Sequence, residues 1–325
     1  MTEAAHSTIA TVARPGAGSG PSAGDHAQAS PSTVRIWVMA ARLRTLPAAI
    51  APVLVGTSLA LGAGTFHALA FVAALLGAIF IQVGTNLSND YSDARRGADS
   101  EDRLGPVRVT AGGLVPPRQV LIATYVTFGL AVLCGAYLVA VAGPELIAVG
   151  AASILAGVLY TGGPRPYGYE GLGEVFVFLF FGIVAVAGSY FVQVQHLPWQ
   201  AFGCAVPVGL LASAILVVNN VRDIDTDRRA GKRTLAVRLG RERTRGLYTA
   251  MLTGAFLSAP VLWALGMSPW LLLSWAVLPL AAELIRTVRT RVDGPSLNGA
   301  LAKTGMLQLL FCILFSAGIL ASGGI

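Results

Sequence analysis

The sequence predicts an all-α, polytopic membrane protein: a bundle of nine transmembrane helices. Hydrophobic residues make up 54% of the chain and charged residues 12%, which is too apolar for an ordinary soluble domain. Several runs approach or exceed the ~20 apolar residues that one helix needs to cross a ~30 Å hydrocarbon layer. These runs are apolar on every face and lack the alternation of barrel strands, so a helical bundle is the expected fold.

Nine hydrophobic runs give the expected helices, of which the fourth is short. They lie at residues 34–62, 66–91, 119–142, 145–161, 171–193, 199–220, 246–266, 270–288 and 299–322. Residues 1–33 are rich in Ala, Gly, Ser and Pro, and are expected to form a disordered tail before a membrane domain at 34–325.

The basic residues predict the orientation in the membrane. All 23 Lys and Arg residues fall on one side of the nine predicted helices, and the connections near residues 62–66, 142–145, 193–199 and 266–270 contain none. Because positive loops stay in the cytoplasm, we expect a multi-pass cell-membrane protein with a cytoplasmic N-terminus and an external C-terminus. Anionic lipid headgroups account for the net charge of +7, and no nucleic-acid motif is present.

Polar side chains form two stripes that begin inside apolar helices. Stripes of this kind put amides and carboxylates along one helix face. The first stripe, with spacing i, i+4, i+7, i+8 and i+11, comprises Gln82, Asn86, Asn89, Asp90 and Asp93. The second repeats every four residues, with Asn220 beside it, and comprises Asn219, Asp223 and Asp227.

The two stripes predict a metal-diphosphate site. Ionisable groups at membrane depth are costly and usually face a protein interior or a water-filled cavity. Two facing acidic stripes repel each other unless cations lie between them, and carboxylate and amide oxygens suit Mg²⁺, which commonly bridges to phosphate oxygens. Nearby cations that can contact phosphate, or instead anchor helix ends, are Arg108, Arg228, Lys232 and Arg233. Lys232 is the strongest candidate, whereas Glu174 is expected to be solvated at a helix end.

At these segments the sequence resembles the UbiA-type intramembrane prenyltransferases, and most closely their 1,4-dihydroxy-2-naphthoate polyprenyltransferase branch. The resemblance spans about residues 41–240. The segments that carry it are AARLRTLPAAIAPVLVGT, NDYSDARRGADSEDRLGPVRVTAGGLV, YTGGPRPYGYEGLGEVFVFLFFG and NNVRDIDTDRRAGKRTLAVRLG.

The family's acidic motifs are matched residue by residue, with one departure. Its first motif, NDxxDxxxD, has Gly97 in place of the last acid, and Asp99 follows two positions later. The remaining matches to this motif, to the second motif DxxxD and to its lysine are Asn89, Asp90, Asp93, Asp223, Asp227 and Lys232. A family tyrosine and a family arginine correspond to Tyr160 and Arg165.

The resemblance implies nine helices around a central cavity, under cytoplasmic capping loops. It implies Mg²⁺-dependent transfer of a polyprenyl chain from an allylic diphosphate to 1,4-dihydroxy-2-naphthoate, with loss of CO₂ and diphosphate, giving demethylmenaquinone. The residues assigned to catalysis are Asp90, Asp93, Asp223 and Asp227; those assigned to Mg²⁺ are Asn89, Asp93, Asp223 and Asp227. Those assigned to the substrates are Arg42, Asn86, Asn89, Arg108, Tyr160, Arg165, Asn219 and Lys232.

Other functions remain open at this stage. A related enzyme could use 4-hydroxybenzoate, homogentisate, haem or a sugar phosphate as acceptor, although the GPVRVTAGGLV segment argues against it. A cation transporter would also hold intramembrane acids, but here both stripes sit at one surface. An alcohol phosphotransferase would show a DGxxAR signature, which the sequence lacks. Neither the isoprenyl length nor the oligomeric state follows from the sequence.

Overall fold

The computed structural model describes residues 32–98 and 104–321, and within these ranges the chain forms helices and no strand. The elements from the first half are α1 (Thr33–Ala41), η1 (Leu43–Thr45), α2 (Leu46–Gly62), α3 (Ala68–Arg95), α4 (Pro117–Ala142) and α5 (Glu145–Leu159). Those that follow are α6 (Gly173–Val177), η2 (Phe178–Val184), α7 (Ala185–Val194), α8 (Trp199–Arg229), α9 (Leu235–Leu239), α10 (Arg241–Ala264), η3 (Pro269–Val277), α11 (Leu278–Thr290) and α12 (Gly294–Ala321).

The described helices match the predicted spans in order and position. Eight of them, some built from two or three consecutive elements, are long and apolar enough to cross a membrane. The remaining predicted span, the fourth at residues 145–161, corresponds to α5, which has 15 residues and is too short to be counted with the eight. The all-α polytopic fold is therefore confirmed, with eight long spans and one short helix. Of the predicted tail, residues 1–31 lie outside the described part of the chain.

Several helices extend beyond the apolar runs that predicted them. The helix α3 continues to Arg95 rather than residue 91, and α8 continues to Arg229 rather than residue 220. Hydropathy marks where lipid contact ends, whereas the hydrogen-bonded helix continues through polar residues. The acids of both stripes consequently lie on regular helix, which fixes their directions.

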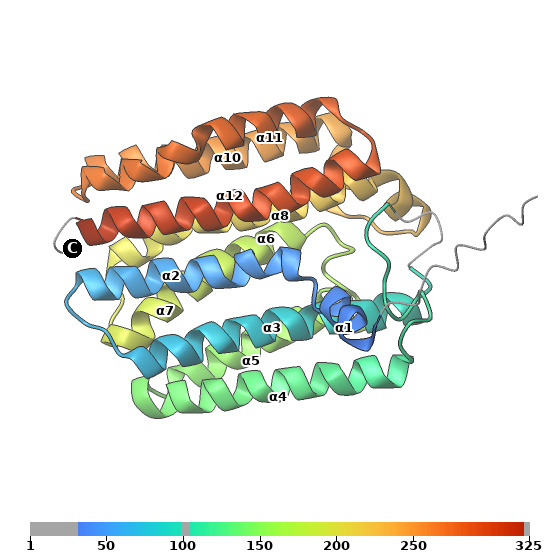
Figure 1. Ribbon diagram of the computed structural model, residues 1–325, viewed down its shortest axis with the longest axis horizontal. Coiled ribbons are helices and arrows are strands. Elements are labelled where there is room, and N and C mark those ends of the chain that lie inside the picture. The colour runs from blue at the N-terminus through green and yellow to red at the C-terminus, as the bar shows by residue number, and fades with distance from the viewer. Residues whose placement is uncertain (1–31, 99–103, 322–325) are drawn as a thin grey trace, which may run out of the picture. The chain divides into compact units, whose positions relative to one another are not determined.

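The helices enclose a cavity whose walls come from α2, α3, α4, α5, α7, α8 and α12, with η2 between them. Along this ring α3 packs on α4 and α5, α2 on α7, and α8 on η2 and α12. Figure 1 shows α3, α4 and α5 lying side by side. The helices α10 and α11 pack outside this ring and pair with α8 and α12, where much of the hydrophobic core is buried.

The first span is broken between α1 and α2. Arg42 has φ +53°, a left-handed conformation that few residues other than glycine adopt, and Pro47 lies in the first turn of α2. The break lets the Arg42 side chain line the cavity instead of continuing along the helix surface.

A π-helical segment, η2, interrupts the span between α6 and α7. Segments of this kind widen a helix locally and are frequent at functional sites. A Cβ atom added at Gly182 would lie 2.7 Å from the Cα atom of Gly209, so the widened segment presses directly on α8. Phe180 and Phe181 of η2 both line the cavity.

Candidate active site

The cavity has a volume of about 780 Å³, with a polar end and an apolar remainder. Both acidic stripes contribute to its lining. The polar residues concerned are Asn86, Asn89, Asp93, Asn219, Asn220, Asp223 and Asp227, together with Arg42, Arg108 and Lys232. Small and aliphatic residues of α3, α4, α5 and α7 line the rest, among them Gly77, Ala78, Gly135, Gly150 and Gly188. The arrangement suits a ligand with a charged head and a long apolar tail.

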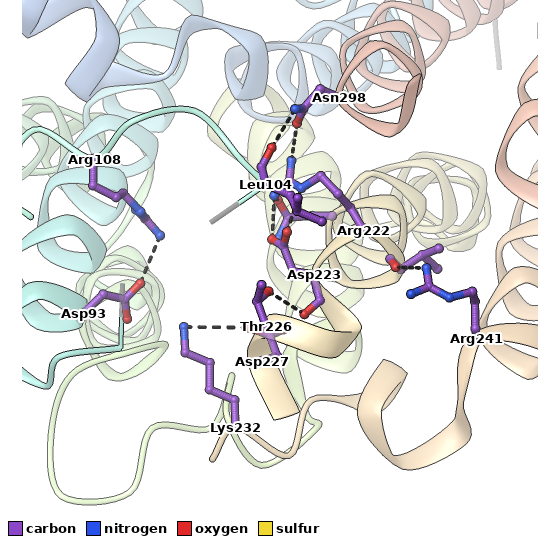
Figure 2. Close-up of polar contacts among 12 residues, drawn as sticks. Asp93, Leu104, Arg108, Arg222, Asp223, Thr226, Asp227, Lys232, Arg241 and Asn298 are labelled. Carbon is purple, nitrogen blue, oxygen red and sulfur yellow. Dashed lines mark hydrogen bonds and ion pairs between the residues drawn. The ribbon is translucent and has the colours of Figure 1, made fainter. Parts of the chain in front are cut away.

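Asp93 is the carboxylate that α3 brings into the cavity. It is 1% exposed and accepts a hydrogen bond from Arg108 Nη2 at 3.0 Å, which forms a buried ion pair (Figure 2). The hydroxyl of Tyr169 donates to the other oxygen of the same carboxylate. Arginine and phenol together compensate a charge that would otherwise be costly at this depth.

Asp223 of α8 is held by Arg222, the residue before it. Arg222 is 3% exposed and donates from Nε to Asp223 Oδ1 at 2.7 Å and from Nη2 to Asp223 Oδ2. It also donates to Asn219 Oδ1 at 2.8 Å and to Asn298 Oδ1 of α12 at 2.6 Å, and Asn298 Nδ2 donates to the Leu104 carbonyl (Figure 2). This planar, multiply bonded guanidinium fixes the carboxylate and links α8 to α12.

A tyrosine connects the two acidic stripes. Lys232 lies 3.9 Å from Asp227 Oδ1 and 4.7 Å from the centre of the Tyr169 ring. Tyr169 in turn bonds Asp93 through its hydroxyl. A single side chain from the loop at residues 160–172 therefore contacts partners from both α3 and the segment that follows α8.

Asp90 has a different environment from the other predicted acids. It does not line the cavity, and its two oxygens accept hydrogen bonds from the backbone nitrogens of Thr110 at 2.9 Å and Val109 at 3.1 Å. These bonds tie residues 104–115, called the strap below, to α3. Arg108, the partner of Asp93, lies in the same strap, so Asp90 connects α3 to the segment that carries Arg108.

We expect Asp90→Asn to loosen the strap and to lower the free energy of unfolding by about 1–2 kcal/mol, because a charged acceptor of two backbone N–H groups is lost. Limited proteolysis should cut within residues 104–115 faster than in the unmodified protein. The Mg²⁺ concentration that gives half-maximal activity should change little. Unchanged cleavage together with a raised Mg²⁺ requirement would instead place Asp90 among the metal ligands.

The predicted amide residues are each fixed by a neighbour. Asn89 Oδ1 accepts from Thr161 Oγ1 at 2.9 Å. Asn86 Nδ2 donates to the Ala41 carbonyl and to Thr45 Oγ1, both at 3.0 Å. Both nitrogen bonds of Asn86 leave its oxygen for a ligand. The Asn89 oxygen accepts one hydrogen bond and keeps a second lone pair, so its assignment to Mg²⁺ stays a prediction.

Gly97 explains the departure from the family's first motif. It has φ +64° and follows the last turn of α3, where a glycine commonly ends a helix in the left-handed conformation. The position that holds an acid in the family's pattern therefore ends the helix here. Asp99, the possible substitute, lies outside the described residues.

Tyr160 and Arg42 line the cavity, whereas Arg165 does not; Arg165 is exposed. Tyr160 meets Tyr167 edge-on at 5.5 Å between ring centres, and Tyr167 stacks on Phe176 at 4.0 Å. The three rings form one aromatic wall of the cavity.

Three residues at the site were not assigned from the sequence. Tyr169 lies in the quoted segment YTGGPRPYGYEG, and Arg222 directly precedes a motif acid, so both positions carried a signal. For Glu174 the expectation was wrong: it is 4% exposed rather than solvated, because α6 packs against α8.

The donor set at the polar end fits Mg²⁺. Among residues 32–98 and 104–321, no group of three or more His, Cys, Asp or Glu side chains is placed to hold a metal ion. Mg²⁺ needs fewer, since it usually takes one or two carboxylates and completes its shell with water and substrate phosphates. Asp223 and Asp227 lie one turn apart on α8, and Asp93 lines the same cavity.

The sequence of this chain matches a known family over most of its length. Residues 49–302 match the family model described as the UbiA prenyltransferase family. The chain belongs to the UbiA prenyltransferase family. It is therefore a multi-pass membrane enzyme, and the predicted prenyltransferase class is confirmed.

Individual relatives agree with this assignment. The chain is 44% identical over 290 residues to the 1,4-dihydroxy-2-naphthoate octaprenyltransferase of Mycobacterium tuberculosis (strain ATCC 25618 / H37Rv), covering 88% of this chain and 97% of that one. It is 38% identical over 305 residues to the enzyme of the same name from Escherichia coli (strain K12), covering 90% and 97%. The fold is similar to that of a UbiA homolog from Archaeoglobus fulgidus bound to DMAPP and Mg2+, with a TM-score of 0.64, 15% identity and coverage of 87% and 98%. The predicted resemblance is confirmed.

Proposed function

We propose that this UbiA-family enzyme transfers a polyprenyl chain from an allylic diphosphate to 1,4-dihydroxy-2-naphthoate in an Mg²⁺-dependent reaction. The observation that carries the proposal is the cavity itself. Its polar end holds Asp93 of α3 and Asp223 and Asp227 of α8, and the rest of its wall is apolar. The names of the relatives in M. tuberculosis and E. coli support the acceptor.

The polar end would bind the diphosphate. Asp93, Asp223 and Asp227 would hold Mg²⁺, which when bound neutralises charge on the departing diphosphate. Lys232 and Arg108 lie beside these acids and would contact phosphate oxygens. Arg42, from the break between α1 and α2, would meet the carboxylate of the aromatic acid. Arg165 is exposed and outside the cavity lining, which favours a role in membrane orientation over one in binding.

Each substrate loses one group in the reaction: the prenyl donor loses diphosphate, and the aromatic acid loses CO₂. The allylic C–O bond breaks and its electron pair leaves with the diphosphate, while the electron-rich ring forms a carbon–carbon bond to the allylic carbon. Loss of CO₂ returns its bonding pair to the ring, which gives demethylmenaquinone in its quinol form. The face of the Tyr160 ring would stabilise positive charge that develops on the allylic carbon, and the apolar wall would limit the access of water to it.

The basic residues support a cytoplasmic location for this polar end. The strap, the loop at residues 160–172 and the segment after α8 all carry arginine or lysine, as loops retained in the cytoplasm do. We therefore propose a cell-membrane enzyme with a cytoplasmic N-terminus, cytoplasmic active-site loops and an external C-terminus, whose substrates enter from the membrane and the cytoplasm.

The proposal is tested by incubating the purified protein in lipid nanodiscs with Mg²⁺, a long allylic diphosphate and a panel of aromatic acids. Prenylated product and released CO₂ are both followed. We expect prenylation of dihydroxynaphthoate with matching CO₂ release, and loss of both in Asp93→Ala at an unchanged protein level. Turnover of 4-hydroxybenzoate alone would overturn the acceptor, and turnover of no aromatic acid would overturn the proposal.

A further inference from the structure

Glu174 is a buried acid that the proposed reaction does not use. It lies in the first turn of α6 and is 4% exposed. Its Oε1 accepts a hydrogen bond from Asn220 Nδ2 at 2.8 Å, and within residues 32–98 and 104–321 its buried Oε2 has no hydrogen-bond partner. A carboxyl group in such a place is costly, so its contact with Asn220 requires an explanation.

The contact decides which end of the Asn220 amide faces the cavity. Asn220 lines the cavity from α8, and its nitrogen is committed to Glu174. The carbonyl oxygen is therefore the end left for a ligand. The neighbouring Asn219 is held in the opposite sense, because its oxygen accepts from Arg222. An acidic and a basic residue thus orient two adjacent amides differently.

We propose that Glu174 is a positioning residue, which holds the carbonyl oxygen of Asn220 toward the cavity to accept a hydrogen bond from a ring hydroxyl of the aromatic acceptor. This inference rests on the proposed function. Of the two substrates, only the dihydroxy aromatic acid carries hydroxyl donors, since an ionised allylic diphosphate offers acceptors and a hydrocarbon tail.

The surroundings of Asn220 favour a flat aromatic ligand. Tyr160, Tyr167 and Phe176 line the same cavity and form the aromatic wall described above. A Cβ atom added at Gly173, the residue before Glu174, would lie 3.3 Å from Tyr160 Cε2, so the wall begins directly beside this acid. A ring stacked on that wall would bring a hydroxyl into reach of an amide oxygen.

The test compares Glu174→Leu, Glu174→Gln and Asn220→Ala with the unmodified protein in nanodiscs. Binding of dihydroxynaphthoate is measured without donor or Mg²⁺, and KM is measured for each substrate. We expect Glu174→Leu and Asn220→Ala to weaken acceptor binding about tenfold with the donor KM unchanged, the effect of one hydrogen bond. Glu174→Gln keeps an acceptor oxygen for Asn220 and should recover most of that affinity. An analogue with both ring hydroxyls methylated should bind the unmodified protein and Glu174→Leu alike.

Two results would overturn the inference. If Glu174→Leu and Asn220→Ala bind the acceptor as tightly as the unmodified protein does, the Asn220 amide makes no hydrogen bond to it. A Glu174→Gln variant as impaired as Glu174→Leu would show that acceptor binding needs the negative charge of Glu174 and not the orientation of the Asn220 amide. If Glu174→Leu does not fold, the inference is judged on the acceptor affinity of Asn220→Ala and on binding of the methylated analogue to Asn220→Ala and the unmodified protein. Failure of the proposed function is seen separately, as absence of dihydroxynaphthoate turnover by the unmodified protein.

Discussion

Replacing Asp223 by asparagine is expected to lower kcat/KM for the allylic diphosphate on the order of 100-fold or more. The change keeps the shape of the side chain and removes the charge that would hold Mg²⁺ at the diphosphate. It also leaves the Arg222 guanidinium, which is 3% exposed, with a neutral partner. The measurement is prenyl transfer over a range of Mg²⁺ and donor concentrations, with thermal unfolding of each protein recorded in parallel.

Asp225→Asn is the matched control for this change. Asp225 lies two residues further along α8, its side chain is 64% exposed, and its ion-pair partners are Arg241 and Arg228. Surface ion pairs of this kind contribute little, so the control should keep nearly full activity. Equal loss in both variants would show that charge on this helix end matters in general, and would contradict a specific role for Asp223.

The second large effect concerns stability. Gly56→Ala in α2 is expected to lower the free energy of unfolding by about 1–3 kcal/mol, because the close approach of α2 and α7 leaves no room for a methyl group. The added Cβ atom would lie 2.3 Å from the Val186 carbonyl oxygen and 2.8 Å from Ser189 Cβ. Unfolding in detergent micelles, followed by circular dichroism against temperature or denaturant, measures the loss.

Gly129→Ala in α4 serves as the control, since nothing lies within 4 Å of a Cβ atom added there. Alanine favours helix over glycine by less than about 1 kcal/mol, so the control should be neutral or slightly stabilising. If Gly56→Ala is as stable as the control, α2 and α7 are not packed as closely as described here.

Hydropathy predicted where the helices lie but not where they end. Lipid contact determines the apolar runs, and these gave the spans in order. The helix α8 continues nine residues past its predicted end at residue 220, to Arg229, because its last turns are rich in charged residues yet remain hydrogen-bonded. The break at Arg42 was not predicted, because the left-handed backbone conformation of an arginine cannot be recognised from hydropathy or composition.

The acidic residues of the candidate site could be predicted from the sequence, but their hydrogen-bond partners only in part. The spacing of Asp223 and Asp227 indicates a helix face that they share with the amides before them. The structure agrees in geometry, because these side chains line one cavity. Spacing cannot distinguish Asp90 from Asp93, although one bonds the strap and the other lines the cavity. The roles of Glu174 and Tyr169 depend on contacts between segments far apart in the sequence, which a single sequence does not encode in any local pattern.

The bridge through Tyr169 has a consequence for how the enzyme tolerates different membranes. Helices adapt to bilayer thickness by tilting, and independent tilts of α3 and α8 would change the spacing of their ends. One phenol bonded to Asp93 and packed under Lys232 resists such changes. The polar end of the cavity would then keep its width in thin and thick bilayers alike. The apolar part of the cavity, which is lined by many small residues, would change shape as the helices tilt.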